Sequence, residues 1–287
     1  MKSKLVKPLT KIVWEQGFSL EDEIFKYLQK SHWTIEPNQY YKDSLNGIIR
    51  EIDLVATKFF EFNSYKIFIT IVIECKYAKS SLVFYTRSLK NKNYPILVRF
   101  GTDLEKRYGF KDLAQIIKSL KQYGGLFFSE EQVFGIQSFR SSTKNNTKKN
   151  SSKTQSLEVD SHTQKDLTSG ITGVASATYY LRDNLFYTKK VDSKNMHLYF
   201  PLVVVSGDLF RAFLGLKKKT LSKESIFKYK VGINKVHKVN ETVEFYVYIV
   251  DKVGMLKVMR MFNQIFNKIS KDIRLKLIPL PKTNLPF

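Results

Sequence analysis

The chain has 287 residues, of which 43% are hydrophobic, and its 48 lysines and arginines outnumber 26 aspartates and glutamates to give a net charge of +22. This length and apolar content suit a globular protein with a sizeable core, and the charge favours a polyanionic partner such as a nucleic acid, although an AT-rich genome would also raise the lysine content. A single cysteine excludes an internal disulfide, four scattered histidines lack zinc-site spacing, and neither a signal peptide nor a membrane-spanning apolar run is present, so we expect a cytoplasmic protein with no membrane partner.

The first predicted helix covers residues 17–28. Its apolar side chains recur at helical spacing, at Leu20, Ile24, Tyr27 and Leu28. Ser19 is the expected N-cap, and Glu21 and Glu23 lie in the first turn, where the helix dipole favours negative charge. A strand over residues 35–41 and a turn with an Asn-Gly signal are expected to follow.

Two strand-like runs, residues 51–56 and 67–76, come next, and the short segment between them contains an Asn-Ser turn signal. A hairpin centred on that segment pairs residues whose numbers sum to about 127, which puts Asp53 opposite Glu74 with their Cβ atoms roughly 5 Å apart. Because side chains alternate across a strand, Glu74 and Lys76 share one face of the second run. The other face of that run carries Ile69, Ile71, Ile73 and Cys75, and in the first run Asp53 shares its face with Glu51 and Val55 while Ile52, Leu54 and Ala56 point the other way.

Charged side chains at the end of the most hydrophobic run are costly to bury, which indicates a chemical role for them. Two facing carboxylates repel unless a cation lies between them, and a hard divalent ion would take oxygen ligands from Asp53, Glu74 and the backbone carbonyl of Cys75. Lys76 would then hold or deprotonate an attacking water, or neutralise charge that develops on a phosphate. These residues predict phosphodiester hydrolysis at a metal site, and the competing interpretation is an ordinary cross-strand salt bridge of Lys76 at a sheet edge.

Asp53, followed by Glu74-Cys75-Lys76, resembles the motif of the PD-(D/E)xK, or restriction-endonuclease-like, nuclease superfamily. Asp53 matches the isolated acid and the other three residues match the acid-x-lysine, while Ile52 stands where the family often has proline. The resemblance covers residues 15–80, and the motif is short and degenerate. It implies an α/β fold with an αβββαβ core, in which a mixed sheet is flanked by helices.

The resemblance also implies a Mg²⁺ requirement, with Mn²⁺ expected to substitute, and cleavage of nucleic acid. Family members often carry a further acid on the helix before the sheet, and Glu21 fits that position best and Glu23 second best. The preference of acids for a helix N-terminus explains both residues equally well without catalysis. The implied catalytic set is Asp53, Glu74, Lys76 and Glu21.

Residues 80–109 combine basic and aromatic side chains, a mixture that suits phosphate contacts and base stacking. We expect Lys79, Arg87 and Lys90 to contact the nucleic-acid backbone. The alternative is a solvated loop that packs its aromatic side chains inward.

A helix over residues 112–123 and a short strand over residues 133–139 are predicted next and complete the αβββαβ order. Residues 140–170 include a long polar run that cannot bury enough apolar surface to order itself. They are predicted to form a flexible insertion, either a basic arm over nucleic acid or a plain linker, within a single domain over residues 1–287.

The C-terminal part is predicted to contain a helix over residues 173–184, strands over residues 198–205 and 244–250, and a helix over residues 254–270. Asp208 is interpreted as a helix N-cap rather than as a metal ligand. The methionine- and phenylalanine-rich side of the last helix is expected to be core, with a partner surface as the alternative.

The leading hypothesis is a Mg²⁺-dependent endonuclease that hydrolyses DNA in restriction, defence or repair, although the residues do not distinguish DNA from RNA or endo- from exonuclease action. One alternative is a noncatalytic nucleic-acid-binding protein with the same fold, and another is a subunit of a defence or repair complex. Double-strand cleavage commonly uses two symmetry-related sites, so the hypothesis is compatible with a homodimer.

Overall fold

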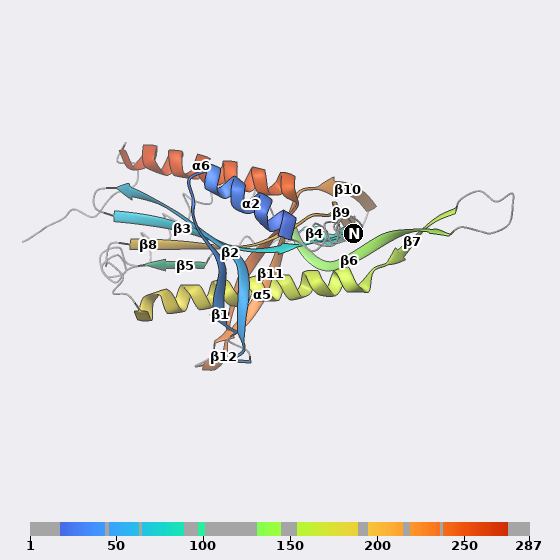
Figure 1. Cartoon of the computed structure of the whole chain (residues 1–287), viewed down its shortest axis with the longest axis horizontal. Helices are drawn as coiled ribbons and strands as arrows, with labels where there is room; N and C mark the ends of the chain where they lie inside the picture. Colours follow the sequence, from blue (N-terminus) through green and yellow to red (C-terminus); the bar gives the residue numbers. More distant parts are fainter. Residues whose placement is uncertain are drawn as a thin grey trace, which may run out of the picture.

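A computed structural model describes residues 18–43, 46–62, 65–88, 97–100, 131–144, 154–188, 195–214, 219–235 and 238–274. Within these ranges the chain is α/β, with mixed sheets flanked by helices (Figure 1). The helices are α2 (Phe18–Lys30), α5 (Ser161–Thr188) and α6 (Lys252–Arg274). The strands are β1 (Thr34–Lys42), β2 (Ile49–Phe62), β3 (Tyr65–Lys76), β4 (Ser81–Ser88), β5 (Leu97–Phe100), β6 (Glu131–Lys144), β7 (Thr154–Val159), β8 (Asn195–Val205), β9 (Leu209–Leu214), β10 (Lys219–Glu224), β11 (Ile226–Lys235) and β12 (Lys238–Val250). None of the helices in the described part of the chain is long and apolar enough to cross a membrane.

The N-terminal elements follow the sequence pattern closely. The predicted first helix and first strand are confirmed by α2 and β1, although α2 begins at Phe18, one residue before the expected N-cap Ser19. The turn between β1 and β2 includes Gly47, whose φ of 71° is a conformation that glycine adopts without strain. The two strands then pair antiparallel from Lys42 opposite Ile49 onward.

The larger sheet has seven strands among the described residues, in the order β1-β2-β3-β8-β12-β11, with β5 also paired to β8. β8 runs parallel to β3 on one side and to β12 on the other. Central parallel strands that are covered on both faces are expected to be continuously apolar. Residues 67–73 and 198–205 have that pattern, and the predicted strand over residues 198–205 is confirmed as part of β8.

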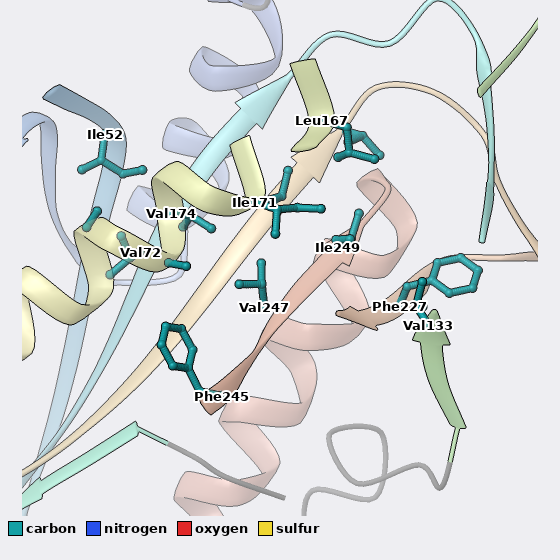
Figure 2. Close-up of a cluster of buried hydrophobic side chains, with 14 of the residues drawn as sticks. Ile52, Val72, Val133, Leu167, Ile171, Val174, Phe227, Phe245, Val247 and Ile249 are labelled. Atoms are coloured by element: carbon teal, nitrogen blue, oxygen red, sulfur yellow. The ribbon is translucent and has the colours of Figure 1, made fainter. Parts of the chain in front are cut away.

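Helices cover both faces of the larger sheet (Figure 1). α2 and α6 pack on one face, where Leu20 and Met259 lie in the same buried cluster, so the prediction that the last helix contributes to the core is confirmed. α5 packs on the other face, where Ile171 and Val174 lie in a second cluster with Val72 of β3 (Figure 2). The strand ends between these layers are where the predicted catalytic residues lie.

The smaller sheet, β10-β9-β4-β6-β7, has five strands within the described ranges and shares the α5 side of the larger sheet. Leu82 and Phe84 of β4 are buried there, and the Phe84 ring stacks on Phe227 of β11 with the ring centroids 4.1 Å apart. Residues 81–88 thus form a strand rather than the solvated loop of the alternative interpretation, although Phe84 packs inward as that interpretation expected.

Strand pairing overturns one further prediction and changes the place of another element. Asp208 is not a helix N-cap, because Leu209 begins β9, which pairs in parallel with β4, and Asp208 instead forms an ion pair of 2.7 Å with Lys223. The strand predicted over residues 133–139 is confirmed as part of β6, but it lies in the smaller sheet and so is not the last strand of the predicted αβββαβ order. The predicted helix over residues 112–123 lies outside the described residues.

The flexible insertion predicted over residues 140–170 is wrong for most of its length. β6 extends to Lys144, β7 pairs with it antiparallel, and α5 begins at Ser161, well before the predicted helix start at residue 173. Residues 145–153 lie outside the described residues. These polar strands order by hydrogen bonding to each other at the edge of the smaller sheet, so they need no apolar face of their own.

Candidate active site at the ends of β2 and β3

The register of the β2–β3 hairpin is the predicted one. The residue numbers of each pair, from Leu54 opposite Ile73 to the turn, sum to 127. One predicted face is wrong: Ile52 packs in the α5 cluster with Val72, whereas Leu54 packs in the opposite cluster with α2. The alternation breaks at Asp53, opposite Asn38 of β1, which has a left-handed φ of 53°. The β1–β2 register is the same on both sides of this point, but Asn38 and Asp53 are not a ladder pair.

Asp53 lies at the point where β2 leaves β3. Its Oδ2 atom accepts a hydrogen bond of 2.6 Å from the backbone N–H of Cys75, a donor that a continued ladder would direct to the main chain of β2. The N–H and C=O of a strand residue point toward the same neighbouring strand, so the Cys75 carbonyl also faces the side of Asp53. The Cys75 side chain is buried in the opposite direction, in the cluster with α2 and α6.

Glu74 and Lys76 form an ion pair beside this hydrogen bond, with Nζ and Oε1 2.5 Å apart and side chains that are 12% and 30% exposed. The pKa of Glu74 is raised to about 7, mainly by burial and then by the charge of Asp53, while Lys76 acts in the opposite direction. Burial also raises the pKa of Asp53, while the hydrogen bond from the Cys75 N–H and the charge of Lys76 act to lower it. Burial by itself would lower the pKa of Lys76, but the charge of Glu74 and its hydrogen bond raise it overall, so Lys76 is an ammonium at neutral pH.

The structure separates the two helix acids. Burial and the negative charge of Asp53 raise the pKa of Glu21, and the charge of Glu21 contributes in turn to the raised pKa of Glu74, so Glu21 belongs to the same electrostatic cluster. Glu23 instead forms an ion pair with Lys252 of α6. Glu21 is thus the helix acid that α2 turns toward the ends of β2 and β3.

Gly170 of α5 is a site residue that the sequence analysis did not identify. A Cβ atom at this position would lie 2.8 Å from Cε of Lys76 and 3.5 Å from Cγ of Glu74, so the helix backbone packs directly against both side chains. Asp166, one turn earlier on α5, adds negative charge that helps to raise the pKa of Lys76. The sequence signal was a glycine inside a helix, but the helix was predicted to begin only after it.

The segment after Lys76 is held in place from two sides. The backbone N–H of Ser206, after β8, donates to the Lys76 carbonyl at 3.1 Å, and the Ser206 Oγ accepts from the N–H of Ala78 at 2.9 Å. The Ser80 hydroxyl donates to Oδ2 of Asp160 at 2.5 Å. The Asp160 carboxylate also accepts from the N–H and the hydroxyl of Thr163, and it thereby caps α5. Asp160 thereby ties the start of α5 to the loop that follows β3.

Replacing Asp160 with alanine should lower the free energy of unfolding by about 1–2 kcal/mol at neutral pH, because a helix cap is lost. Hydrogen bonds from Ser80 and Thr163 lower the pKa of Asp160 from 3.8 to about 2, so its contribution is full above pH 4 and disappears as the pH falls toward 2. Urea unfolding at a series of pH values measures this. Asp160→Asn keeps a capping acceptor and should lose less, and equal losses for the two variants would contradict the capping role.

The predicted backbone contacts are not brought together at the site. Lys79 is exposed in the loop after β3, with its Nζ 5.9 Å from the centroid of the Tyr77 ring. Arg87 lies near the far end of β4, with its guanidinium 5.5 Å from the centroid of the Phe134 ring. At about 3.3 Å per residue, Arg87 is roughly 25 Å along the chain from Lys79. Lys90 lies outside the described residues.

The donors at the strand ends fit a hard divalent cation. In the described part of the chain, no group of three or more His, Cys, Asp or Glu side chains could hold a metal ion. Two partly buried carboxylates that repel each other, on Asp53 and Glu74, and the carbonyl of Cys75 make an all-oxygen set. Mg²⁺ commonly takes one or two carboxylates and completes its shell with water. Neutralising that repulsion is what a cation would supply.

The chemistry of the site is therefore defined by its geometry: two carboxylates, one ammonium and a helix acid at the splayed ends of two strands. The contacts that establish this arrangement are the hydrogen bond from Cys75 to Asp53, the Glu74–Lys76 ion pair and the effect of the Asp53 charge on Glu21. Comparisons with protein-family models, with curated proteins and with solved structures find no match to the chain.

Proposed function

We propose that the chain is a Mg²⁺-dependent endonuclease that hydrolyses DNA phosphodiester bonds, in restriction, defence or repair. The observation that carries the proposal is the hydrogen bond from the Cys75 N–H to Asp53, which keeps that carboxylate beside Glu74 and Lys76 where β2 leaves β3. A plain cross-strand salt bridge would need only one acid for Lys76, whereas here a second, partly buried acid, Asp53, raises the pKa of Glu74.

The proposal includes a restriction-endonuclease-like core. It is supported by the order of elements around the larger sheet, in which α2 and β1–β3 are followed by α5 and β8. That order reads αβββαβ once the strands of the smaller sheet, β4, β6 and β7, and the short β5 are treated as additions between β3 and α5. The candidate residues lie on α2, β2 and β3 of this core.

Each residue has a role that follows from its position. Asp53, Glu74 and the Cys75 carbonyl would hold the cation, which when bound polarises a phosphoryl oxygen and lowers the pKa of the attacking water. Lys76 stays protonated, so it would stabilise negative charge on the phosphate or orient water as a donor rather than act as a base. Glu21, with a raised pKa, would orient or assist.

The test is cleavage of supercoiled plasmid by wild type, Lys76→Ala and Lys26→Ala in Mg²⁺, Mn²⁺ and EDTA. Lys26 is a matched control, because it forms an exposed ion pair with Asp22 on α2. Wild type and the control should nick or linearise the plasmid in both metals but not in EDTA, and Lys76→Ala should be at least about 100-fold slower. Intact plasmid with every folded protein would contradict the nuclease and favour the noncatalytic binding protein.

A further inference from the structure

A polar cleft lies between the first half of α5 and the end of the β1–β2 hairpin. Its volume is about 570 Å³, within the range of ligand sites. One wall is a stripe of α5 side chains at helical spacing that includes Gln164, Lys165, Ser169 and Thr172, and the other wall carries Arg50. The opposite side of α5, with Ile171, is buried against the sheet.

Polar residues would also be expected on a face of α5 that is simply exposed to solvent, but such a face would not have a second wall opposite it. Here the Arg50 side chain is 45% exposed and its Nε donates to Oδ2 of Asp43 at 2.8 Å, and that carboxylate group is only 7% exposed. The buried carboxylate therefore holds the guanidinium on the cleft wall in a fixed orientation. A planar, pre-positioned guanidinium facing a lysine is a favourable arrangement for phosphate.

The cleft lies next to the candidate active site along α5. Ser169, which lines it, precedes Gly170, whose backbone packs on Lys76, and Gly173, which also lines it, lies beside the Tyr41 hydroxyl. The stripe from Ser161 to Thr172 is about 16 Å long at 1.5 Å per residue. That length corresponds to about five nucleotides of one strand at 3.4 Å each.

We infer that this cleft binds the sugar-phosphate backbone of the nucleic acid on one side of the phosphate that is cut, with Arg50 and Lys165 contacting phosphates across it. The inference rests on the proposed function for the identity of the polymer, but binding in the cleft needs neither metal nor turnover. A small phosphate compound that fills the cleft by itself is the alternative that the experiment must separate.

The chain offers a specific crosslinking test, because its single cysteine, Cys75, is 8% exposed and burial raises the pKa of its thiol well above the usual value. Thr172→Cys, in the cleft, and Lys257→Cys, exposed on α6 across the sheet, would each carry a cysteine-linked photocrosslinker. With a DNA duplex in EDTA, Thr172→Cys should crosslink at least tenfold more than Lys257→Cys. Equal yields, or none at Thr172→Cys, would overturn the inference.

A second measurement reverses a charge in the cleft and needs no photocrosslinker. Lys165→Glu should weaken duplex binding about tenfold and reduce its salt dependence, whereas Lys257→Glu should change neither. Loss of the Thr172→Cys crosslink in millimolar mononucleotide, with duplex binding otherwise intact, would show a small-ligand pocket and overturn the inference.

The two proposals fail separately. Crosslinking in the cleft without plasmid cleavage in Mg²⁺ would refute the nuclease and keep the binding site. Metal-dependent cleavage with no crosslink from the cleft would support the nuclease and refute the binding site.

Discussion

Gly170→Ala should reduce the rate of cleavage about 100-fold while leaving the fold intact. The added methyl group would lie 2.8 Å from Cε of Lys76, and the free end of a lysine side chain moves more easily than the helix backbone. Lys76 would therefore give way and carry its ammonium out of position, and a displacement of about 1 Å in a catalytic group can cost about 100-fold in rate. Single-turnover cleavage in Mg²⁺, with duplex binding measured in parallel, checks this, and binding should be unchanged.

Gly135→Ala is the matched control, at a glycine of β6 in the smaller sheet. Its methyl group would lie 3.5 Å from Cδ2 of Tyr85, an ordinary contact. Alanine is more favourable than glycine inside a strand by about 0.5–1 kcal/mol, so this variant should be active and slightly more stable. Equal activity of the two variants would show that the approach of α5 does not position Lys76.

Glu74→Gln should make the metal-free protein more stable at pH 8 by about 1–3 kcal/mol, while abolishing cleavage. The pKa of Glu74 is raised from 4.5 to about 7, so the folded protein holds this proton more tightly than the unfolded chain does. The free energy of unfolding of the wild type therefore falls as the pH rises from about 4.5 to about 7, and the cost is complete above pH 7. A glutamine cannot ionise and avoids that cost.

Chemical unfolding in EDTA at pH 5 and pH 8 measures the effect, which should be small at pH 5 and full at pH 8. Glu36→Gln, which removes the same charge at an exposed position of β1, should not raise the free energy of unfolding comparably. Added Mg²⁺ should stabilise the wild type, by about 1.4 kcal/mol at ten times its dissociation constant, and should stabilise Glu74→Gln much less. A wild type that gains nothing from Mg²⁺ would contradict a cation site at these carboxylates.

Local pattern was enough to predict the part of the site that lies on one hairpin. The alternation of apolar and polar residues and a short turn predicted the register of β2 and β3, and with it the approach of Asp53 to Glu74. These contacts are between residues near in sequence, so strand periodicity and loop length decide them. The alternation did not predict the reversed face of Ile52, which occurs beside a left-handed residue, Asn38, in the neighbouring strand.

The sequence by itself determined α2, the β2–β3 register and the buried strand β8, because each has a local signal: an apolar helical period, strand alternation with a short turn, and a continuous apolar run. Only the tertiary structure decided that polar residues 161–170 form part of α5, since this helix is stabilised by the cap of Asp160 and by packing of Leu167 and Ile171 on the sheet. The same packing brings Gly170 onto Lys76 and opens the cleft beside Arg50. Such contacts join segments far apart in the chain, and they depend on how layers meet rather than on any local repeat.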